Sequence, residues 1–308
     1  MIRKGVIISA LGDSYKVALR EDDSSGSASK KEYICKPRGV FRAKDITPYC
    51  GDNVLFDDID DNTAVITEVL KRKNEIIRPP LANLDQIVFV ISTCEPSPNI
   101  LLLDKFLAVA EHKGIASVIV FTKTDKCPAD EYADIYRGVY PVLCVDNTRT
   151  ADNEGVDALK AILKDKFSAF TGNSGAGKSS LLNNICPGLN LQTNEISRKL
   201  GRGKHTTRRV DIYKLDCGGY IADTPGFSTF ETSRYDMIMK DELAYCFPDF
   251  APYLGKCRFQ DCSHTKEQGC AVIEAVKDGK VSKSRHDSYC KMYEEAKAIK
   301  PWEIKPRT

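Results

Sequence analysis

GNSGAGKS, at residues 172–179, stands between the apolar run SAFT (168–171) and the helix-forming run SLLNNI (180–185). It fits the pattern G-x-x-x-x-G-K-[ST], whose glycines let backbone N–H groups converge on phosphate oxygens at the start of a helix. In this pattern Lys178 reaches the β- and γ-phosphates, and the hydroxyl of Ser179 ligates Mg²⁺. A chance match in a glycine loop is the alternative, and the flanking strand and helix count against it. The predicted nucleotide contacts are Gly172, Asn173, Ser174, Gly175, Ala176, Gly177, Lys178, Ser179 and Ser180.

A second motif, DTPG, ends the apolar run YIADTPG about 45 residues further on. Its first residue, Asp223, can hold Mg²⁺ through water, and Gly226 can place a backbone N–H beside the γ-phosphate. The motif is weak alone, but its place at a strand end after a phosphate-binding loop is good evidence for a nucleoside triphosphatase.

A third motif, TKTD at residues 122–125, follows the buried-strand pattern ASVIVF and indicates the base. The carboxylate of Asp125 can accept hydrogen bonds from both N1–H and the 2-amino group of guanine, a donor pair that adenine lacks. The stem of Lys123 can cover the base plane, and Thr122 takes the position that more often holds Asn. A solvated charged turn is the alternative. Because the base motif precedes the phosphate loop, the order predicts a circularly permuted GTPase domain, since domain termini often lie close together.

The rest of the chain suggests three domains within its 308 residues. Short β-rich runs predict a barrel at residues 1–72, for which an RNA-binding OB-fold is the natural candidate and a small β-sandwich or an SH3-like barrel the alternative. Alternating strands and amphipathic helices over residues 73–232 predict an α/β GTPase domain with a mostly parallel sheet. Residues 233–308 predict a mainly helical, zinc-binding domain.

Composition narrows the class of protein further. Hydrophobic residues make up 42% and charged residues 29%, as in soluble globular proteins, and the net charge of +2 gives no global nucleic-acid signature. No apolar run is long enough for a transmembrane helix, and the N-terminal apolar stretch is broken by Gly12 and Asp13, which favours strands over a signal peptide. We therefore expect a cytoplasmic monomer without a membrane partner.

Four metal-ligating residues lie within fourteen positions of the C-terminal region, and they predict one structural Zn²⁺ site. Three thiols and one imidazole suit tetrahedral Zn²⁺ and leave no open position for a catalytic water; three unpaired cysteines beside a surface histidine are the alternative. We expect Cys246 and Cys290 in the core and His286 on the surface. The predicted zinc ligands are Cys257, Cys262, His264 and Cys270.

With these motifs in hand, the chain resembles the RsgA type of GTPases that depend on the small ribosomal subunit. The resemblance covers nearly the whole chain and rests on RGVFRAKDITPYCGDNV, RPPLANLDQIVFVIS, FTKTD, GNSGAGKSSLLN, GRGKHTTRRV, DTPGF and CRFQDCSHTKEQGCAV. It implies an OB-fold, a permuted GTPase and a zinc domain. It also implies that GTP is hydrolysed to GDP during late 30S maturation, that the ribosome stimulates this step, and that 16S rRNA is contacted.

The resemblance also suggests roles in GRGKHTTRR. Either Thr206 or Thr207 corresponds to the switch threonine that ligates Mg²⁺ with GTP, and the choice stays open. Phe227 stands where Ras-like enzymes orient water with glutamine, and phenylalanine cannot do so by hydrogen bonding. His205 is a candidate for that role, equal in weight to an exposed histidine in a mobile loop. The usual Ser-Ala-type motif that supports the base is replaced by residues 146–148, DNT.

Basic runs are the candidate RNA contacts: residues 38–44, 71–73, 198–209 and 277–283. For most of them a solvated surface is the favoured interpretation, and the run at 198–209 is the exception because it coincides with the switch. On the barrel, Tyr33, Phe41 and Arg42 are candidates. Two rival functions remain open at this point: a P-loop ATPase or kinase, and a non-enzymatic RNA-binding module whose nucleotide site is only a switch.

Overall fold

The computed structural model describes residues 2–19, 32–39, 41, 46–59, 63–149, 153–187, 210–223 and 237–299. The chain forms two compact units. The first comprises Met1–Ile87, Val156–Ser174 and Lys178–Thr229, and the second comprises Val88–Gly155, Gly175–Gly177 and Phe230–Thr308. Among the described residues, no helix combines the length and the apolar character that a membrane crossing requires.

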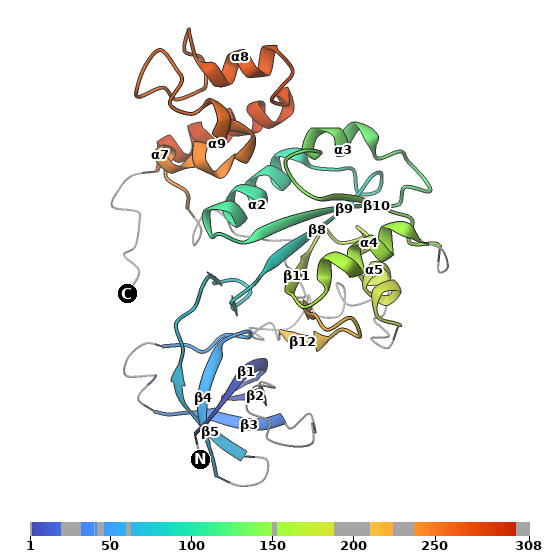
Figure 1. Ribbon diagram of the computed structural model, residues 1–308, viewed down its shortest axis with the longest axis vertical. Helices are drawn as coiled ribbons and strands as arrows, with labels where there is room; N and C mark the ends of the chain where they lie inside the picture. Colours follow the sequence, from blue (N-terminus) through green and yellow to red (C-terminus); the bar gives the residue numbers. More distant parts are fainter. Residues whose placement is uncertain are drawn as a thin grey trace. The chain divides into compact units, whose positions relative to one another are not determined.

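A closed five-stranded barrel opens the first unit (Figure 1). β1 pairs antiparallel with β2 and β4, β2 with β3, and β4 with β5, while β3 pairs parallel with β5 and so completes the ring. The predicted barrel is therefore confirmed. Its strands are β1 (Ile2–Leu11), β2 (Ser14–Leu19), β3 (Glu32–Pro37), β4 (Asn53–Asp58) and β5 (Thr63–Val69).

The interior of the barrel corrects one expectation about RNA contacts. Side chains alternate between inside and outside along a strand, and in β3 this places Tyr33 inward, where it is fully buried. Its ring packs 5.1 Å from that of Phe56. Phe41 is only 6% exposed. Both aromatic rings therefore build the core and are not offered to nucleic acid, while Arg42 lies outside the described residues.

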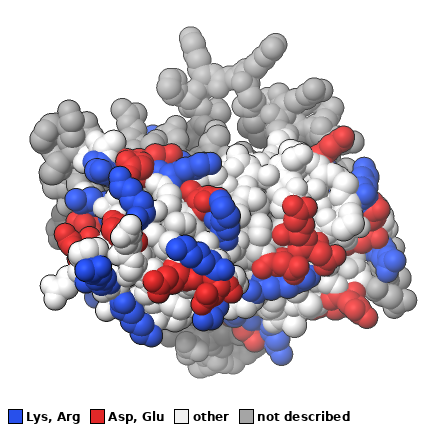
Figure 2. All heavy atoms as spheres, turned by 90° about the horizontal axis from the view of Figure 1, so that it is seen from above, with Lys and Arg blue, Asp and Glu red and all other residues white. Residues whose placement is uncertain are grey.

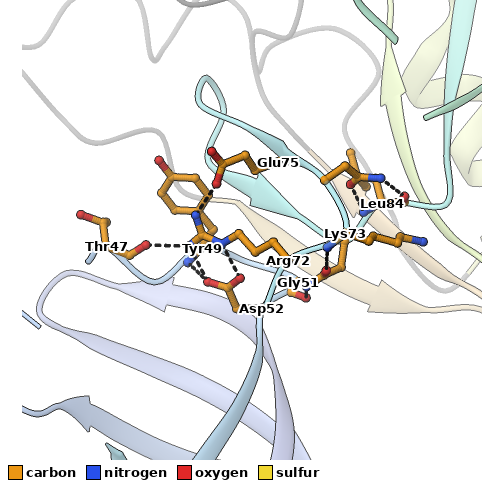
Figure 3. Close-up of polar contacts among 10 residues, drawn as sticks. Thr47, Tyr49, Gly51, Asp52, Arg72, Lys73, Glu75 and Leu84 are labelled. Carbon is orange, nitrogen blue, oxygen red and sulfur yellow. Dashed lines mark hydrogen bonds and ion pairs between the residues drawn. The ribbon is translucent and has the colours of Figure 1, made fainter. Parts of the chain in front are cut away.

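Arg72 lies where the chain leaves the barrel, and it joins this segment to the barrel loop through hydrogen bonds (Figure 3). Its Nε and Nη2 each donate to the Asp52 carboxylate at 2.8 Å, and its Nη1 donates to Glu75 at 2.6 Å. The guanidinium also lies 4.1 Å from the centre of the Tyr49 ring. Burial acts to lower the pKa of Arg72, but hydrogen bonds and the charge of Asp52 outweigh it and raise that pKa. The boundary predicted at residue 72 falls within this network.

Two asparagines complete the same junction. The side chain of Asn74 pairs with Leu84, accepting from its N–H and donating to its carbonyl, both at 2.9 Å. Asn83 donates to the Gly51 carbonyl and accepts from the Lys73 N–H, again at 2.9 Å. These bonds hold the short hairpin of β6 (Glu75–Ile76) and β7 (Leu81–Ala82) against the barrel loop.

The remaining strands of the first unit precede and follow the phosphate-loop motif along the chain. β11 (Phe167–Thr171) runs parallel to β13 (Tyr220–Asp223), and β13 is antiparallel to β12 (Asp211–Lys214). β12 in turn meets β1 of the barrel. The helix α5 (Lys178–Ile185) follows the motif, and the core side of this helix carries Leu181 and Leu182.

In the second unit, three strands lie in the order β8, β9, β10. β9 and β10 are parallel, as the alternating pattern predicts. The sheet is accompanied by α2 and α3, and α2 begins at a cap in which Asn99 accepts a hydrogen bond from the Leu102 N–H. The elements are β8 (Gln86–Ser92), α2 (Ile100–His112), β9 (Ala116–Thr122), α3 (Asp130–Tyr136), β10 (Val142–Val145) and α4 (Glu154–Leu163), which continues into the first unit.

The C-terminal helices belong to the second unit and pack on α2 through a buried arginine. Arg285 is 1% exposed and donates to Asp104 of α2 at 2.8 Å and to Asp249 at 2.6 Å. Its guanidinium also stacks over Phe247 at 4.7 Å. A buried pair of this kind is costly to break because an unpaired charge would remain. The helices are α7 (Lys240–Leu243), η3 (Ala244–Cys246), η4 (Pro248–Tyr253), α8 (Ala271–Lys277) and α9 (Lys283–Ala298).

Charges of both signs are mixed on one face of the molecule. Lysine and arginine side chains are intermingled with aspartate and glutamate on the face shown in Figure 2. Within two of the basic runs, cations are already paired: Lys73 with Asp85, Lys280 with Asp278 and Lys283 with Asp287. Neutralised cations of this kind contribute less to phosphate attraction. The run at 198–209 lies outside the described residues.

Candidate guanine-nucleotide and metal sites

The base motif forms a tight turn at the end of β9. Thr122 is fully buried, and Lys123 adopts the left-handed conformation at φ 61°. The Lys123 carbonyl accepts hydrogen bonds from the N–H groups of Lys126 at 2.9 Å and Cys127 at 3.3 Å. The turn leaves the Asp125 side chain exposed, so a ligand can reach its carboxylate.

A pocket of 440 Å³ lies beside this turn. Because Asp125 lines it, a base that enters can present hydrogen-bond donors to a carboxylate. The pocket's other wall comes from the loop after β10 and the start of α4. Its lining residues are Thr124, Asp125, Cys144, Asp146, Arg149, Asn153, Glu154 and Gly155.

The loop that replaces the Ser-Ala-type motif is shaped by Asp146. Its carboxylate accepts from the Thr148 hydroxyl at 2.6 Å and from the Thr148 N–H at 2.8 Å. Both hydrogen bonds lower the pKa of Asp146, and the bond from the Thr148 hydroxyl has the larger effect. The carboxylate therefore stays charged and stabilises the turn through hydrogen bonds to the residue two positions on. Asp146 therefore organises the loop from within.

The phosphate-loop motif has the backbone that its sequence predicts. It leaves β11 at Thr171 and enters α5 at Lys178. Gly175 and Gly177 have φ values of 80° and 85°, in the left-handed region that favours glycine. The conformation of Gly177 therefore requires glycine, and a Cβ atom there would lie 2.9 Å from the Asn147 amide nitrogen and displace it.

Two side chains of the second unit form hydrogen bonds to the backbone of the phosphate loop at Ala176 and Gly177. The Thr122 hydroxyl donates to the Ala176 carbonyl at 2.6 Å, and the Asn147 amide donates to the Gly177 carbonyl at 3.2 Å. Phosphate-loop and base-motif residues are thus brought together, although the sequence separates them by about fifty positions. No sequence pattern predicts this role of Asn147, because a side chain that binds a backbone carbonyl leaves no spacing pattern.

Replacing Thr122 with valine tests this link. We expect nucleotide affinity to fall about tenfold for guanine and adenine nucleotides alike, because the buried Ala176 carbonyl loses a bond that costs ~1–3 kcal/mol to leave unmade. Binding can be followed with a fluorescent GDP analogue. Ser117→Ala, in the same strand, is the control, because the Ser117 hydroxyl is buried without a hydrogen-bond partner among the described residues. Unchanged affinity in Thr122→Val would show that the link does not position the loop.

Some predicted site residues cannot be placed at side-chain level. Asp223 ends β13, and nothing beyond its backbone is described. Gly226, Phe227, His205, Thr206 and Thr207 lie outside the described residues.

The four predicted zinc ligands converge. Their ligand atoms all lie within 4.8 Å of one another. The Cys257 and Cys270 sulfurs are 3.8 Å apart, and His264 Nδ1 lies 3.4 and 3.5 Å from them. A tetrahedron with Zn–S of ~2.3 Å and Zn–N of ~2.0 Å has edges of about 3.8 Å between sulfurs and about 3.5 Å between sulfur and nitrogen. The residues therefore fit zinc in geometry as well as in chemistry.

The pKa shifts of two ligands are also consistent with a metal site. Burial lowers the pKa of His264 and so favours the neutral imidazole that binds metal. Burial also raises the pKa of Cys262 to about 12. A divalent cation opposes this second shift because it stabilises the thiolate. A bound divalent cation would therefore favour the thiolate form of Cys262 that a metal ligand requires.

An outer layer of hydrogen bonds fixes the ligand loop. His286 donates from Nε2–H to the His264 carbonyl at 2.7 Å, and Tyr289 donates to the Ser263 carbonyl at 2.8 Å. The expectation that His286 lies on the surface is wrong: it is 9% exposed and supports the metal loop. Cys246 is buried as expected, whereas Cys290 is partly exposed.

Comparisons with known proteins agree with this architecture. The RsgA N-terminal domain model matches residues 4–66, and the RsgA GTPase model matches residues 69–233. A Bacillus subtilis protein named small ribosomal subunit biogenesis GTPase RsgA is 41% identical over 306 residues, covering 97% of this chain and 99% of its own. A Thermotoga maritima protein of the same name is 38% identical, with 95% and 96% covered.

Solved structures show the same fold. YjeQ from Thermotoga maritima superposes with a TM-score of 0.81 at 34% identity, covering 97% of this chain and 100% of its own. YloQ, described as a circularly permuted GTPase, has a TM-score of 0.77 at 34% identity, with 98% and 97% covered. The permuted GTPase prediction is confirmed, and an ATPase, a kinase or a non-enzymatic module is no longer favoured. The chain belongs to the RsgA family of circularly permuted, GTP-hydrolysing enzymes.

Proposed function

We propose that this GTPase binds the small ribosomal subunit and hydrolyses GTP to GDP during late 30S maturation, with turnover stimulated by the subunit. The observation that carries the nucleotide part is the bond from Thr122 to Ala176, which joins the base motif to the phosphate loop. The names of the relatives, small ribosomal subunit biogenesis GTPases, support the ribosomal part. The protein would act as a cytoplasmic monomer and contact 16S rRNA.

Each residue of the site has a proposed task. Asp125 reads the guanine edge and Lys123 covers its plane. Backbone N–H groups of the phosphate loop surround the phosphates at the start of α5, where the helix dipole favours negative charge. Lys178 contacts the β- and γ-phosphates, and Gly226 offers a further N–H to the γ-phosphate. The other proposed contacts of the loop are Gly172, Asn173, Ser174, Gly175, Ala176, Gly177 and Ser180.

Mg²⁺, when bound with GTP, would neutralise charge on the β- and γ-phosphate oxygens. Ser179, Asp223 and one of Thr206 and Thr207 would hold it. No side-chain hydrogen bond from Phe227 can orient the attacking water, and His205 or a group of the ribosome would take that role. Ordering of residues 198–209 on rRNA phosphates would link subunit binding to turnover.

Phosphate release measured with and without 30S subunits tests this function. We expect the subunits to raise turnover by at least about tenfold, because a group supplied in trans can stabilise or align the transition state. The measurement uses the full chain under saturating GTP. Equal turnover with and without subunits would contradict ribosomal stimulation while leaving GTP hydrolysis itself intact.

A charge-reversal pair locates the coupling surface in the same assay. Arg208→Glu with Arg209→Glu should abolish the stimulation and spare GTP binding. Lys280→Glu with Lys283→Glu is the matched control, because both lysines are already paired with aspartates. Loss of GTP binding in the first pair would mean that these arginines serve the nucleotide.

A further inference from the structure

Hydrogen bonds hold the turn at residues 146–149, which follows β10, in one shape; we call it the Asn147 turn. The side-chain amide of Asn153 donates to the Asp146 carbonyl at 2.7 Å and to the Arg149 carbonyl at 3.2 Å. The Arg149 N–H also donates to the Asp146 carbonyl, at 3.3 Å. Between these two ends, Thr148 is bonded to the Asp146 carboxylate through its N–H and its hydroxyl. The backbone from which the Asn147 side chain extends is therefore fixed.

This turn and β9 hold two consecutive peptide units of the phosphate loop. The Asn147 amide donates to the Gly177 carbonyl at 3.2 Å. The Thr122 hydroxyl donates to the preceding carbonyl, that of Ala176, at 2.6 Å. A trans peptide unit is planar, and its C=O and N–H point in opposite directions. The Ala176 carbonyl shares its unit with the Gly177 N–H, and the Gly177 carbonyl shares its unit with the Lys178 N–H. Both N–H groups therefore point away from Thr122 and Asn147.

The backbone at this point has the shape of an anion-binding loop. Gly177 has a φ of 85° and stands directly before Lys178, the first residue of α5. A left-handed residue next to right-handed ones turns successive N–H groups toward a common centre, where an anion can bind. In the phosphate-loop motif these N–H groups surround the phosphates of the nucleotide. The direction of the Gly177 and Lys178 N–H groups therefore determines how well the loop fits its ligand.

We propose that Asn147 is a positioning residue for nucleotide binding: it holds the Gly177 carbonyl so that the Lys178 N–H is directed at the phosphates. The same turn serves the other end of the nucleotide, because Asp146 and Arg149 line the pocket beside the base motif. One turn thus contributes a wall to the base pocket and a hydrogen bond to the phosphate loop. The inference rests on the proposed guanine-nucleotide function and assigns the Asn147 side chain a task within it.

Nucleotide competition on the full-length protein tests the proposal. The competitors of a fluorescent GDP analogue are GDP, ADP and inosine diphosphate (IDP), which lacks the 2-amino group of guanine. Asn147→Ala removes the amide donor and most of the side-chain volume, whereas Asn147→Leu removes the donor and keeps a similar volume. Thr148→Ala is the matched control, because it loses a hydrogen bond within the same turn that does not reach the phosphate loop. Thermal unfolding of each variant checks that it is folded at the assay temperature.

We expect both Asn147 variants to bind GDP and IDP roughly fivefold more weakly, and by the same factor, because the phosphate contacts weaken while the base is recognised as before. Thr148→Ala should stay within about twofold of the wild type.

Three results would overturn the proposal. Wild-type affinity in Asn147→Leu would show that the side chain only fills space or positions nothing. An equal loss in Thr148→Ala would assign the effect to the shape of the turn. A changed ratio of GDP to IDP affinity would place it at the base. A wild-type protein without preference for GDP over ADP would instead contradict the guanine site, and the loss of ADP affinity in the variants would then decide on Asn147.

Discussion

Asp125→Asn is expected to lower the affinity for GDP and GTP about 100-fold, or ~2.7 kcal/mol. The carboxylate can accept two hydrogen bonds from guanine, whereas the amide turns an –NH₂ donor toward a donor on the base and leaves it unpaired. Xanthine carries a carbonyl where guanine has its 2-amino group, so the variant should gain affinity for xanthine nucleotides. Competition of GDP, XDP and ADP against a fluorescent GDP analogue measures both changes.

Asp134→Asn is the matched control for this substitution. Asp134 is an exposed aspartate of α3 that pairs with Arg137, and it lies outside the pocket beside Asp125. It should bind GDP as the wild type does. If Asp125→Asn weakened all nucleotides equally, with no preference for XDP, the carboxylate would be supporting the turn and not reading the base.

The fold could be predicted from the sequence where local patterns carry it. The β-rich composition of the segment that forms β3 predicted a strand, and glycine spacing predicted the phosphate loop. Composition could not tell which face of β3 turns inward, because Tyr33 is as suited to an RNA-binding surface as to a core. Closure of the barrel decided this: the parallel pairing of β3 with β5 turns Tyr33 inside, where its ring meets Phe56.

The sequence predicted those residues of the candidate site that belong to a motif with a known chemical role. Asp125 and the cysteine ligands belong to recognisable spacings. Asn147 and His286 act on backbone carbonyls of residues far along the chain, at Gly177 and His264. Such bonds depend on tertiary structure and leave no local signature.

Cys262→Ser is expected to abolish zinc binding and to destabilise the C-terminal helices by at least about 3 kcal/mol, because binding of a structural metal contributes directly to folding. A serine hydroxyl is a much poorer zinc ligand than a thiolate. Metal content by mass spectrometry gives the first measurement. Cys290→Ser is the control, since Cys290 lies beside the cluster, 4.0 Å from the Thr265 carbonyl, without belonging to it. Unchanged zinc in Cys262→Ser would refute the ligand set.

Hydrogen exchange then shows how far the loss of zinc spreads. Amides of α8 and α9 should lose protection first, because the ligand loop is bonded to α9 through His286 and Tyr289. Protection in α2 should fall as well, because Arg285 of α9 neutralises Asp104 of α2, whose pKa is raised by burial despite that charge. The barrel strands β1–β5 belong to the other compact unit and should keep their protection. If α2 stayed fully protected, the Arg285 pair would survive without the metal, and zinc would stabilise only its own loop.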